Sequence, residues 1–326
     1  MDRTIDIETS YFYRGLAAFS VIVSHYAKWY MENGSYGIIA QLMSTIGRYG
    51  VAIFLFFSGY GLVMSVHKRN RIDKGFLLRR FGTVYIPYLM IKAIDEIITY
   101  GKIRNLMKLF FALDNWYIAT IIIFYIMFYL LYRYLYKYRI KFLFLGILVY
   151  SLLAFGLRLN EAWYLSNICF LMGVLYSEFI LNKEEDGFHI TLRKILLFTE
   201  LSRKMLYIFA TLFVFLYLLY LYLALREMSF YLIVKIIISI VFVNLVLQMI
   251  GQLKIREFNI VKYSGVISLE LYLLHRLCLG LSSNWFAIDN RICNMILGCV
   301  ITFFVSGAFN RLYSVATKTL KRILVL

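Results

Sequence analysis

Two side chains that can do chemistry, Arg14 and His25, lie within one long apolar segment near the N-terminus. They are 11 residues apart, which is close to three turns of an α-helix, so both project from the same face. At a rise of about 1.5 Å per residue they are about 16 Å apart along the helix axis. An imidazole can take a proton from a hydroxyl group, and a guanidinium can bind an anion. Ionisable residues inside an apolar span mark a functional site by default.

A late apolar segment contains a second set of such residues: Glu270, His275 and Arg276. His275 is 15 residues into this segment, and His25 is 14 residues into its own. Because both segments are expected to cross a membrane in the same direction, we expect the two imidazoles to lie at similar depth. A glycine-rich segment, 50–61, adds a hydroxyl at Ser58, and its glycines permit close approach of a neighbouring backbone.

These residues must be positioned by membrane helices. The chain of 326 residues is 62% hydrophobic and only 16% charged, whereas soluble domains are about 45–50% apolar and about 25% charged. This composition excludes a cytosolic enzyme, a disordered protein and a secreted disulfide scaffold. The net charge of +17 is distributed in short runs between apolar segments, which is typical of a polytopic membrane protein and argues against a nucleic-acid partner.

The apolar segments predict the number of spans and their orientation. Ten segments have about the 20 apolar residues that a spanning helix needs, namely 11–30, 46–66, 81–100, 115–136, 141–158, 162–181, 205–225, 229–251, 260–281 and 291–315. With the N-terminus inside, 22 Lys and Arg residues fall in cytoplasmic segments and four in outer loops. Since positive residues accumulate on the cytoplasmic side, we predict an all-α membrane protein with about ten transmembrane helices and both termini in the cytoplasm.

No internal repeat or linker divides the sequence, so we expect residues 1–326 to form a single transmembrane domain without a fused extracellular domain. The four cysteines show no metal-ligand spacing, and we predict no metal site.

The ends of the predicted spans provide further candidates. The densest basic run, 67–80, ends with Arg79 and Arg80. It either sets the topology alone or holds a phosphate-rich ligand, because Arg binds phosphate with two parallel hydrogen bonds. On the predicted outer side, Trp116, Arg158 and Glu161 are candidates for binding a substrate, although aromatic residues at an interface more often contact lipid headgroups.

Several of these motifs, taken in order, resemble acyltransferase family 3, the bacterial integral-membrane O-acyltransferases. The resemblance covers essentially the whole chain and rests on Arg14–Ala18 with His25, Gly50–Val51 with Phe56–Tyr60, Arg79–Arg80 with Pro87–Tyr88, Trp116–Tyr117, Phe170–Gly173 and Gly265–His275. The chain departs from the family at Tyr11, where an acidic residue is usual, and at Thr83, where many members have a basic one.

The resemblance implies transfer of an acyl group, most often acetyl, from acyl-CoA to a hydroxyl of a cell-surface polysaccharide or its lipid-linked precursor. The acyl-CoA is a substrate, and no permanently bound cofactor is expected. We expect His25 to be the general base and Arg79, Arg80 and Arg14 to bind the CoA. Ser58, Tyr60 and His275 are the candidates for stabilising the oxyanion. The location implied is the plasma membrane.

Other hypotheses remain open from the sequence. A covalent acyl-enzyme on Ser58 or His25 would replace direct transfer. A transporter or flippase of lipid-linked sugars would share the composition. A different polytopic acyltransferase fold would use His275 as the base, and a membrane-embedded assembly factor would have no catalytic residue.

Overall fold

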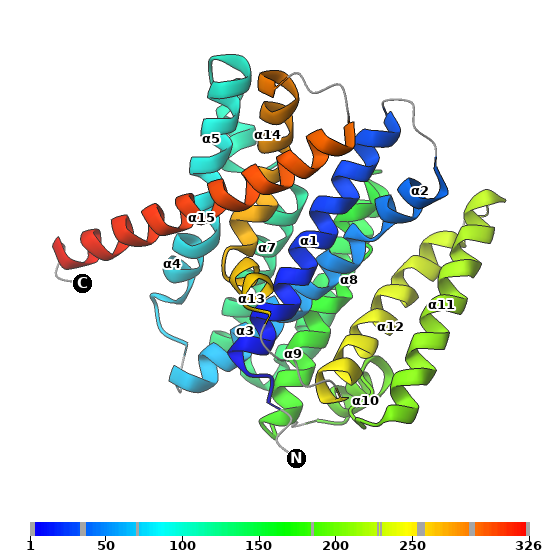
Figure 1. The fold of residues 1–326 in the computed structure, drawn as a ribbon. Coiled ribbons are helices and arrows are strands. Elements are labelled where there is room, and N and C mark those ends of the chain that lie inside the picture. Colours follow the sequence, from blue (N-terminus) through cyan, green and yellow to red (C-terminus); the bar gives the residue numbers. More distant parts are fainter. Residues whose placement is uncertain are drawn as a thin grey trace. The chain divides into compact units, whose positions relative to one another are not determined.

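A computed structural model describes residues 4–32, 37–69, 72–183, 186–226, 228, 230–252, 258–286 and 291–323. Within these ranges the regular structure is entirely helical (Figure 1). Among the 22 basic residues that the sequence assigns to cytoplasmic segments are Arg3, Arg71, Lys254 and Arg256. These four lie outside the described residues.

The helices follow one another with short connections. In chain order they are α1 (Ile7–Glu32), α2 (Ile38–Thr45), α3 (Gly47–Arg69), α4 (Phe76–Arg80), the π-helical turn η1 (Phe81–Tyr85), α5 (Ile86–Tyr100), α6 (Leu106–Phe110), α7 (Trp116–Tyr134), η2 (Tyr136–Tyr138), α8 (Arg139–Gly156), η3 (Glu161–Trp163), α9 (Ile168–Ile180), α10 (Gly187–Leu196), α11 (Arg203–Leu225), α12 (Tyr231–Gln252), α13 (Asn259–Val266), α14 (Ser268–Phe286) and α15 (Arg291–Ile323).

Seven helical segments of the described residues are long and apolar enough to cross a membrane: Ala40–Arg69, Trp116–Tyr134, Tyr136–Gly156, Glu161–Ile180, Arg203–Ala224, Tyr231–Gln252 and Ile292–Thr319. The bent pair α13 and α14 makes an eighth if it is one broken span, with an angle of 86° at the break. The other two expected spans, 11–30 and 81–100, also fall on helices, α1 and η1–α5, which are outside this set. The chain is therefore a multi-pass helical protein, while the count of ten and the orientation stay predictions.

The contacts between residues divide the chain into two compact units, each assembled from three segments. The first consists of Met1–Ser10, Val51–Leu78 and Ala119–Glu257. The second consists of Tyr11–Gly50, Arg79–Ile118 and Phe258–Leu326. Long helices such as α1, α3 and α7 have residues in both, because the chain passes from one unit to the other within them.

The first unit is built around α9, in which every residue from Cys169 to Glu178 is buried. Helix α3 crosses it closely because glycine lies at the contact on each side. A Cβ added at Gly59 would come within 2.1 Å of the carbonyl oxygen of Phe170, and one at Gly173 within 2.0 Å of that of Phe56. The close spacing of the two backbones at this crossing therefore depends on both glycines.

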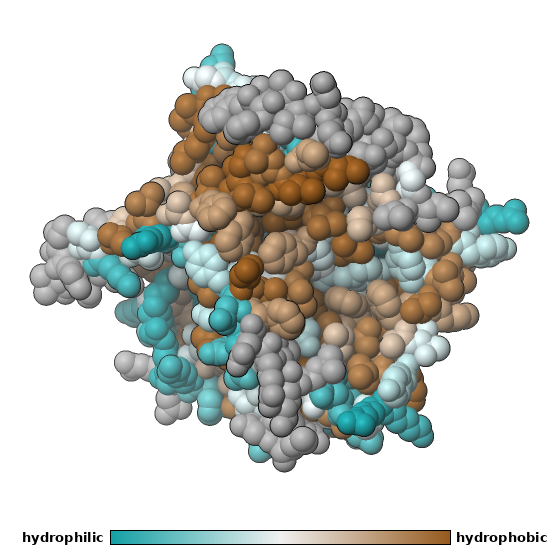
Figure 2. All heavy atoms as spheres, viewed as in Figure 1, coloured by the Kyte–Doolittle hydropathy of each residue, from teal (hydrophilic) through white to brown (hydrophobic). Residues whose placement is uncertain are grey.

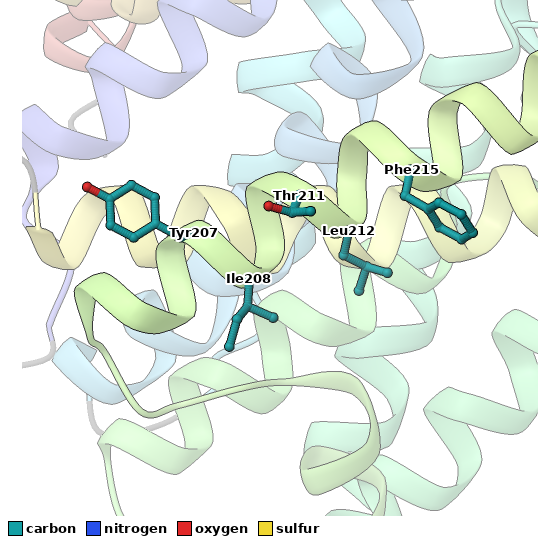
Figure 3. A pocket seen from close by; sticks show the side chains of 5 residues that line it. All are labelled: Tyr207, Ile208, Thr211, Leu212 and Phe215. Atoms are coloured by element: carbon teal, nitrogen blue, oxygen red, sulfur yellow. The ribbon is translucent and has the colours of Figure 1, made fainter.

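The surface of the first unit is strongly apolar along α11, which packs beside α12 (Figure 1). Tyr207, Ile208, Thr211, Leu212 and Phe215 line a shallow groove, and all five side chains project from this one helix (Figure 3). Apolar residues also cover much of the visible face of the molecule (Figure 2). Large exposed apolar areas of this kind require lipid as the surrounding solvent.

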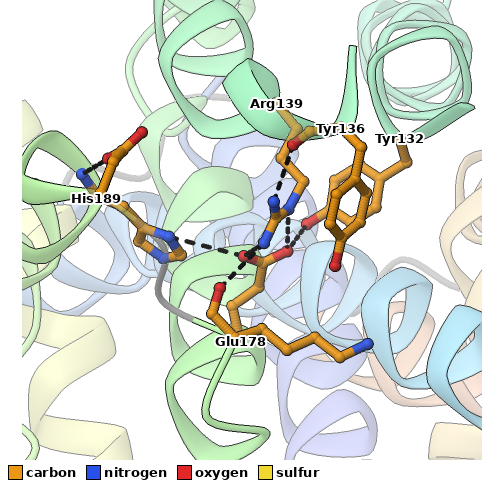
Figure 4. Close-up of polar contacts among 7 residues, drawn as sticks. Tyr132, Tyr136, Arg139, Glu178 and His189 are labelled. Carbon is orange, nitrogen blue, oxygen red and sulfur yellow. Dashed lines mark hydrogen bonds and ion pairs between the residues drawn. The ribbon is translucent and has the colours of Figure 1, made fainter. Parts of the chain in front are cut away.

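A buried ion pair joins α8 to α9 in the first unit. Arg139 donates from Nε to Glu178 Oε1 at 2.7 Å and from Nη2 to Oε2 at 2.6 Å, and both residues are almost fully buried. The Tyr132 hydroxyl donates to the same carboxylate, and His189 Nδ1 of α10 lies 3.7 Å from it. Figure 4 shows these side chains converging on Glu178. Arg139 also donates to the Lys183 carbonyl at 3.0 Å, three residues beyond the end of α9.

The second unit contains most of α1 together with α5, α14 and α15. Helix α15, at 33 residues, is about 50 Å long and packs along α14. A small buried cluster of Ile91, Leu274 and Cys278 forms the apolar contact between α5 and α14. These helices carry the candidate site.

Candidate active site

The start of the site is fixed by a very close crossing of α1 and α13. A Cβ added at Gly15 would come within 2.0 Å of the Val261 carbonyl oxygen, and one at Gly265 within 1.8 Å of the Tyr11 carbonyl oxygen. Real Cβ atoms do not approach so closely, so the two backbones touch only because both residues are glycine. The chain then turns sharply at Ile267, and α14 begins at Ser268 beside α1.

The two imidazoles lie together in this unit. The ring centroids of His25 on α1 and His275 on α14 are 4.9 Å apart, with an angle of 34° between the rings. This proximity agrees with the expected similar depth of the two histidines, which stays a prediction. The side chain of His275 is buried at 3% exposure, whereas His25 is half-buried.

Each imidazole ring makes a polar contact through its Nδ1 atom. Nδ1 of His275 is 2.7 Å from the carbonyl oxygen of Tyr272, one turn earlier in α14. Nδ1 of His25 is 3.4 Å from Nη2 of Arg276. Helix α14 therefore contributes both the second ring and the residue that holds the first.

The backbone behind His275 is fixed by hydroxyl groups from two other helices. The hydroxyl of Tyr26 on α1 donates to the His275 carbonyl at 3.1 Å and lies 3.2 Å from Oγ1 of Thr302 on α15. Thr302 in turn donates to the Gly298 carbonyl at 2.6 Å. Each of these two buried hydroxyls has a carbonyl acceptor, and the bond from Tyr26 resists rotation of α14 about its axis.

A row of aromatic rings leads from the imidazole pair to the start of α7. The Tyr272 ring lies 6.1 Å from His275 and 5.1 Å from Tyr117, and Tyr117 lies 6.0 Å from Trp116. The Tyr272 hydroxyl donates to Oδ1 of Asn115 at 3.1 Å, and the same oxygen caps α7 by accepting from the backbone amide of Ile118. Trp116 is thus half-buried at the first position of α7.

Arg14 is bound by the beginning of α14. Its Nη2 donates to Oγ of Ser268 at 3.0 Å, and Ser268 is buried. Two residues later, the Glu270 carboxylate accepts from Nδ2 of Asn310 on α15 at 2.7 Å. Arg14 and His25 therefore both contact α14, as their shared face predicts, with Ser268 and Arg276 as the contacts.

Arg79 and Arg80 form the last turn of α4 in the second unit, and both are half-buried. The next residues form the π-helical turn η1, whose wider winding is common at functional positions. The Tyr313 hydroxyl of α15 donates to the Gly82 carbonyl in this turn. Pro87 lies at the start of α5, where it is tolerated, so this helix continues through it.

The remaining candidates lie in the first unit. Ser58 is half-buried on α3. Arg158 is exposed and has a positive φ of 54° just after α8. Glu161 forms an ion pair with Lys235 of α12, whose ammonium also lies 4.7 Å from the centre of the Tyr231 ring. The roles of these three residues stay predictions.

Three residues that contact the site were given no role of their own from the sequence: Ser268, Tyr272 and Asn115. Their importance depends on which atoms meet across helices that are far apart in the chain. Ser268 is 254 residues from Arg14, and Tyr272 is 157 residues from Asn115. Ser268 and Tyr272 lie within Gly265–His275, a segment that carries the family resemblance, but the resemblance does not show which atoms they contact.

Comparison with known families decides what kind of protein this is. The profile of the acyltransferase domain of family 3 matches residues 12–311, which includes both imidazoles and Arg14. The chain belongs to acyltransferase family 3. Neither a curated protein nor a solved structure matches it. As a member of this family the protein is a multi-pass membrane acyltransferase, so the resemblance inferred from the separate motifs is confirmed.

Proposed function

We propose that this acyltransferase moves an acetyl group from acetyl-CoA to a hydroxyl of a cell-surface polysaccharide or of its lipid-linked precursor, at the plasma membrane. The observation that carries the proposal is the pair of imidazoles, His25 and His275, in contact within a family of acyltransferases. An alcohol is a weak nucleophile at neutral pH, and a positioned imidazole that removes its proton contributes about 10²–10⁴-fold to the rate.

The donor end of the site is proposed at the arginines of the second unit. Coenzyme A carries several phosphate charges, and guanidinium groups bind phosphate strongly and with fixed geometry. Arg79 and Arg80, at the end of α4, suit the phosphates. Arg14, held by Ser268, suits the pantetheine arm or the developing charge at the thioester.

The acceptor end is proposed at Trp116, with Arg158 and Glu161 as further candidates from the sequence. Trp116 begins the aromatic row that ends at the imidazoles. Aromatic rings suit the apolar faces of sugar rings, and their polar edges suit an aqueous boundary. Ser58 is kept as a candidate for stabilising the oxyanion.

Membership of an acyltransferase family favours group transfer over transport of a lipid-linked sugar. It also favours this fold over the other polytopic acyltransferase fold considered from the sequence. Direct transfer is preferred to an acyl-enzyme because two imidazoles supply both a proton acceptor and a hydrogen-bond donor without a covalent step.

The test uses the purified full chain in lipid nanodiscs with radiolabelled acetyl-CoA and unmodified cell-surface glycan. We expect label in the glycan with the wild-type protein and none with the double variant His25→Ala/His275→Ala. Mass spectrometry of glycan from cells with and without the protein should show a mass difference of one acetyl group per modified site. Glycan that is identical in the two cell types would overturn the proposal.

A further inference from the structure

The two imidazoles of the pair carry their protons on different nitrogens. A guanidinium has only N–H donors and no acceptor. Because Arg276 Nη2 donates to Nδ1 of His25, that nitrogen must present its lone pair. The single proton of the neutral ring is then on Nε2, so His25 offers an N–H group at this atom.

His275 has the opposite arrangement. A backbone carbonyl only accepts, so Nδ1 of His275 must carry the proton that it donates to Tyr272. The lone pair of this ring is therefore on Nε2. That atom is buried, and none of the described residues forms a hydrogen bond with it. Among the residues that the structure describes, it is the basic nitrogen of the pair that no side chain or backbone group engages.

We propose that His275 Nε2 is the general base, that His25 Nε2–H is the hydrogen-bond donor to the thioester carbonyl, and that Arg276 is the positioning residue that enforces this division. The assignment rests on the proposed function and reverses the roles expected from the sequence, where His25 was the base. For His25 to accept a proton, the proton would have to go to Nδ1, which the guanidinium of Arg276 already occupies.

The division of roles gives a balanced reaction. The acceptor O–H bond breaks and its proton moves to His275 Nε2, while the oxygen forms a bond to the acyl carbon. The resulting oxyanion accepts the hydrogen bond from His25 Nε2–H. When the C–S bond breaks, its electron pair stays on the sulfur of CoA, and the proton on His275 passes to that sulfur. The products are the ester and free CoA thiol, and both rings return to their starting protonation.

Glutamine substitutions distinguish a hydrogen-bond donor from a general base. The side-chain amide of glutamine reaches about as far as Nε2 of histidine and can donate a hydrogen bond, but it cannot take a proton at neutral pH. His25→Gln should therefore keep part of the donor function, whereas His275→Gln should lose the base and about 10²–10⁴-fold in kcat. We expect kcat of His25→Gln to exceed that of His275→Gln by at least about tenfold. Equal values, or the reverse order, would overturn the assignment.

The role of Arg276 can be tested by measuring which ring nitrogen of each histidine carries its proton. The chain has four histidines, so ¹⁵N NMR of protein labelled in the imidazole gives few signals, which the two glutamine variants assign. We expect the proton of His25 on Nε2 and that of His275 on Nδ1. Arg276→Met should release His25 into a mixture of tautomers. It should also lower kcat with little change in KM for acyl-CoA. Arg276→Lys keeps a hydrogen-bond donor and should recover part of kcat.

A proton on Nδ1 of His25 in the wild-type protein, or a His25 tautomer that Arg276→Met leaves unchanged, would overturn the role of Arg276. The NMR measurement needs no turnover, so it tests the pair even if the wild-type protein transfers no acetyl label, a result that would instead overturn the proposed function. Active wild-type protein with the reversed order of glutamine variants would keep the proposed function and reject the division of roles.

Discussion

Arg14 donates a 3.0 Å hydrogen bond to the hydroxyl of Ser268, at the point where the broken helix pair α13–α14 resumes. Through this contact the short, neutral side chain of Ser268 holds the charged side chain of Arg14 in a fixed position. Because α14 also provides His275 and Arg276, the same helix sets the position of Arg14 and of both imidazoles. The distance between Arg14 and the two imidazoles is therefore determined by one helix crossing.

Replacing Ser268 with alanine should release Arg14. A hydrogen bond to a charged group is worth about 1.5–3 kcal/mol, so we expect KM for acyl-CoA to rise by about tenfold or more. Ser268→Thr keeps the hydroxyl and should behave like the wild type. The matched control is Ser264→Ala, another buried serine, whose hydroxyl donates to the Ile260 carbonyl of its own helix. Steady-state kinetics in which both alanine variants have the wild-type KM would contradict the role of Ser268.

The α1–α13 crossing should not tolerate a methyl group. Gly15→Ala places Cβ 2.0 Å from the Val261 carbonyl oxygen, and overpacking of this kind costs about 1–3 kcal/mol. We expect a lower Tm and a loss of turnover, because the start of α14 moves with α13. Gly280→Ala is the control, since a Cβ there meets nothing within 4 Å, and alanine stabilises a helix by about 0.5–1 kcal/mol relative to glycine. Thermal melts of the detergent-solubilised protein would refute this if Gly15→Ala and Gly280→Ala had the same Tm.

The buried pair of Arg139 and Glu178 should be needed for folding rather than for chemistry. Arg139→Met leaves a buried carboxylate without its cation, which costs about 3–5 kcal/mol. Arg139→Met/Glu178→Leu removes both charges, so its loss of stability should be smaller than that of the single variant. The Tm of each variant can be measured by heating samples to a series of temperatures and determining the folded fraction by size-exclusion chromatography. A double variant less stable than Arg139→Met would mean that the contacts of Glu178 to Tyr132 and His189 matter more than the ion pair.

The arginines at the end of α4 should control donor affinity. Each charged hydrogen bond lost in Arg79→Ala/Arg80→Ala corresponds to about 1.5–3 kcal/mol, so KM for acyl-CoA should rise by at least about tenfold, with a smaller effect on kcat. Arg203→Ala/Lys204→Ala removes two basic, exposed residues at the start of α11 and should leave KM unchanged. Inhibition by free CoA provides a second measure. Donor KM that stays at the wild-type value in Arg79→Ala/Arg80→Ala would reject the phosphate site.

The class of protein was predictable because hydropathy is a local property. Runs of about 20 apolar residues between basic loops predict a multi-pass helical protein whatever the packing, and all ten expected segments fall on helices. The face shared by Arg14 and His25 was predictable for the same reason, since a regular helix fixes the angle between residues 11 positions apart. The family could be recognised because its motifs are short and ordered along the chain.

Contacts between distant segments could not be predicted in this way. Arg139 was one of many basic residues in a predicted cytoplasmic loop, yet it is buried against Glu178. Lys235 and Glu161 are 74 residues apart and form an ion pair. Which nitrogen of each imidazole carries its proton depends on Arg276 and Tyr272 at a distance of a few ångströms. The sequence determined the helices and the residue types available, because these follow from local physics, while the tertiary structure alone decided which of those side chains face one another.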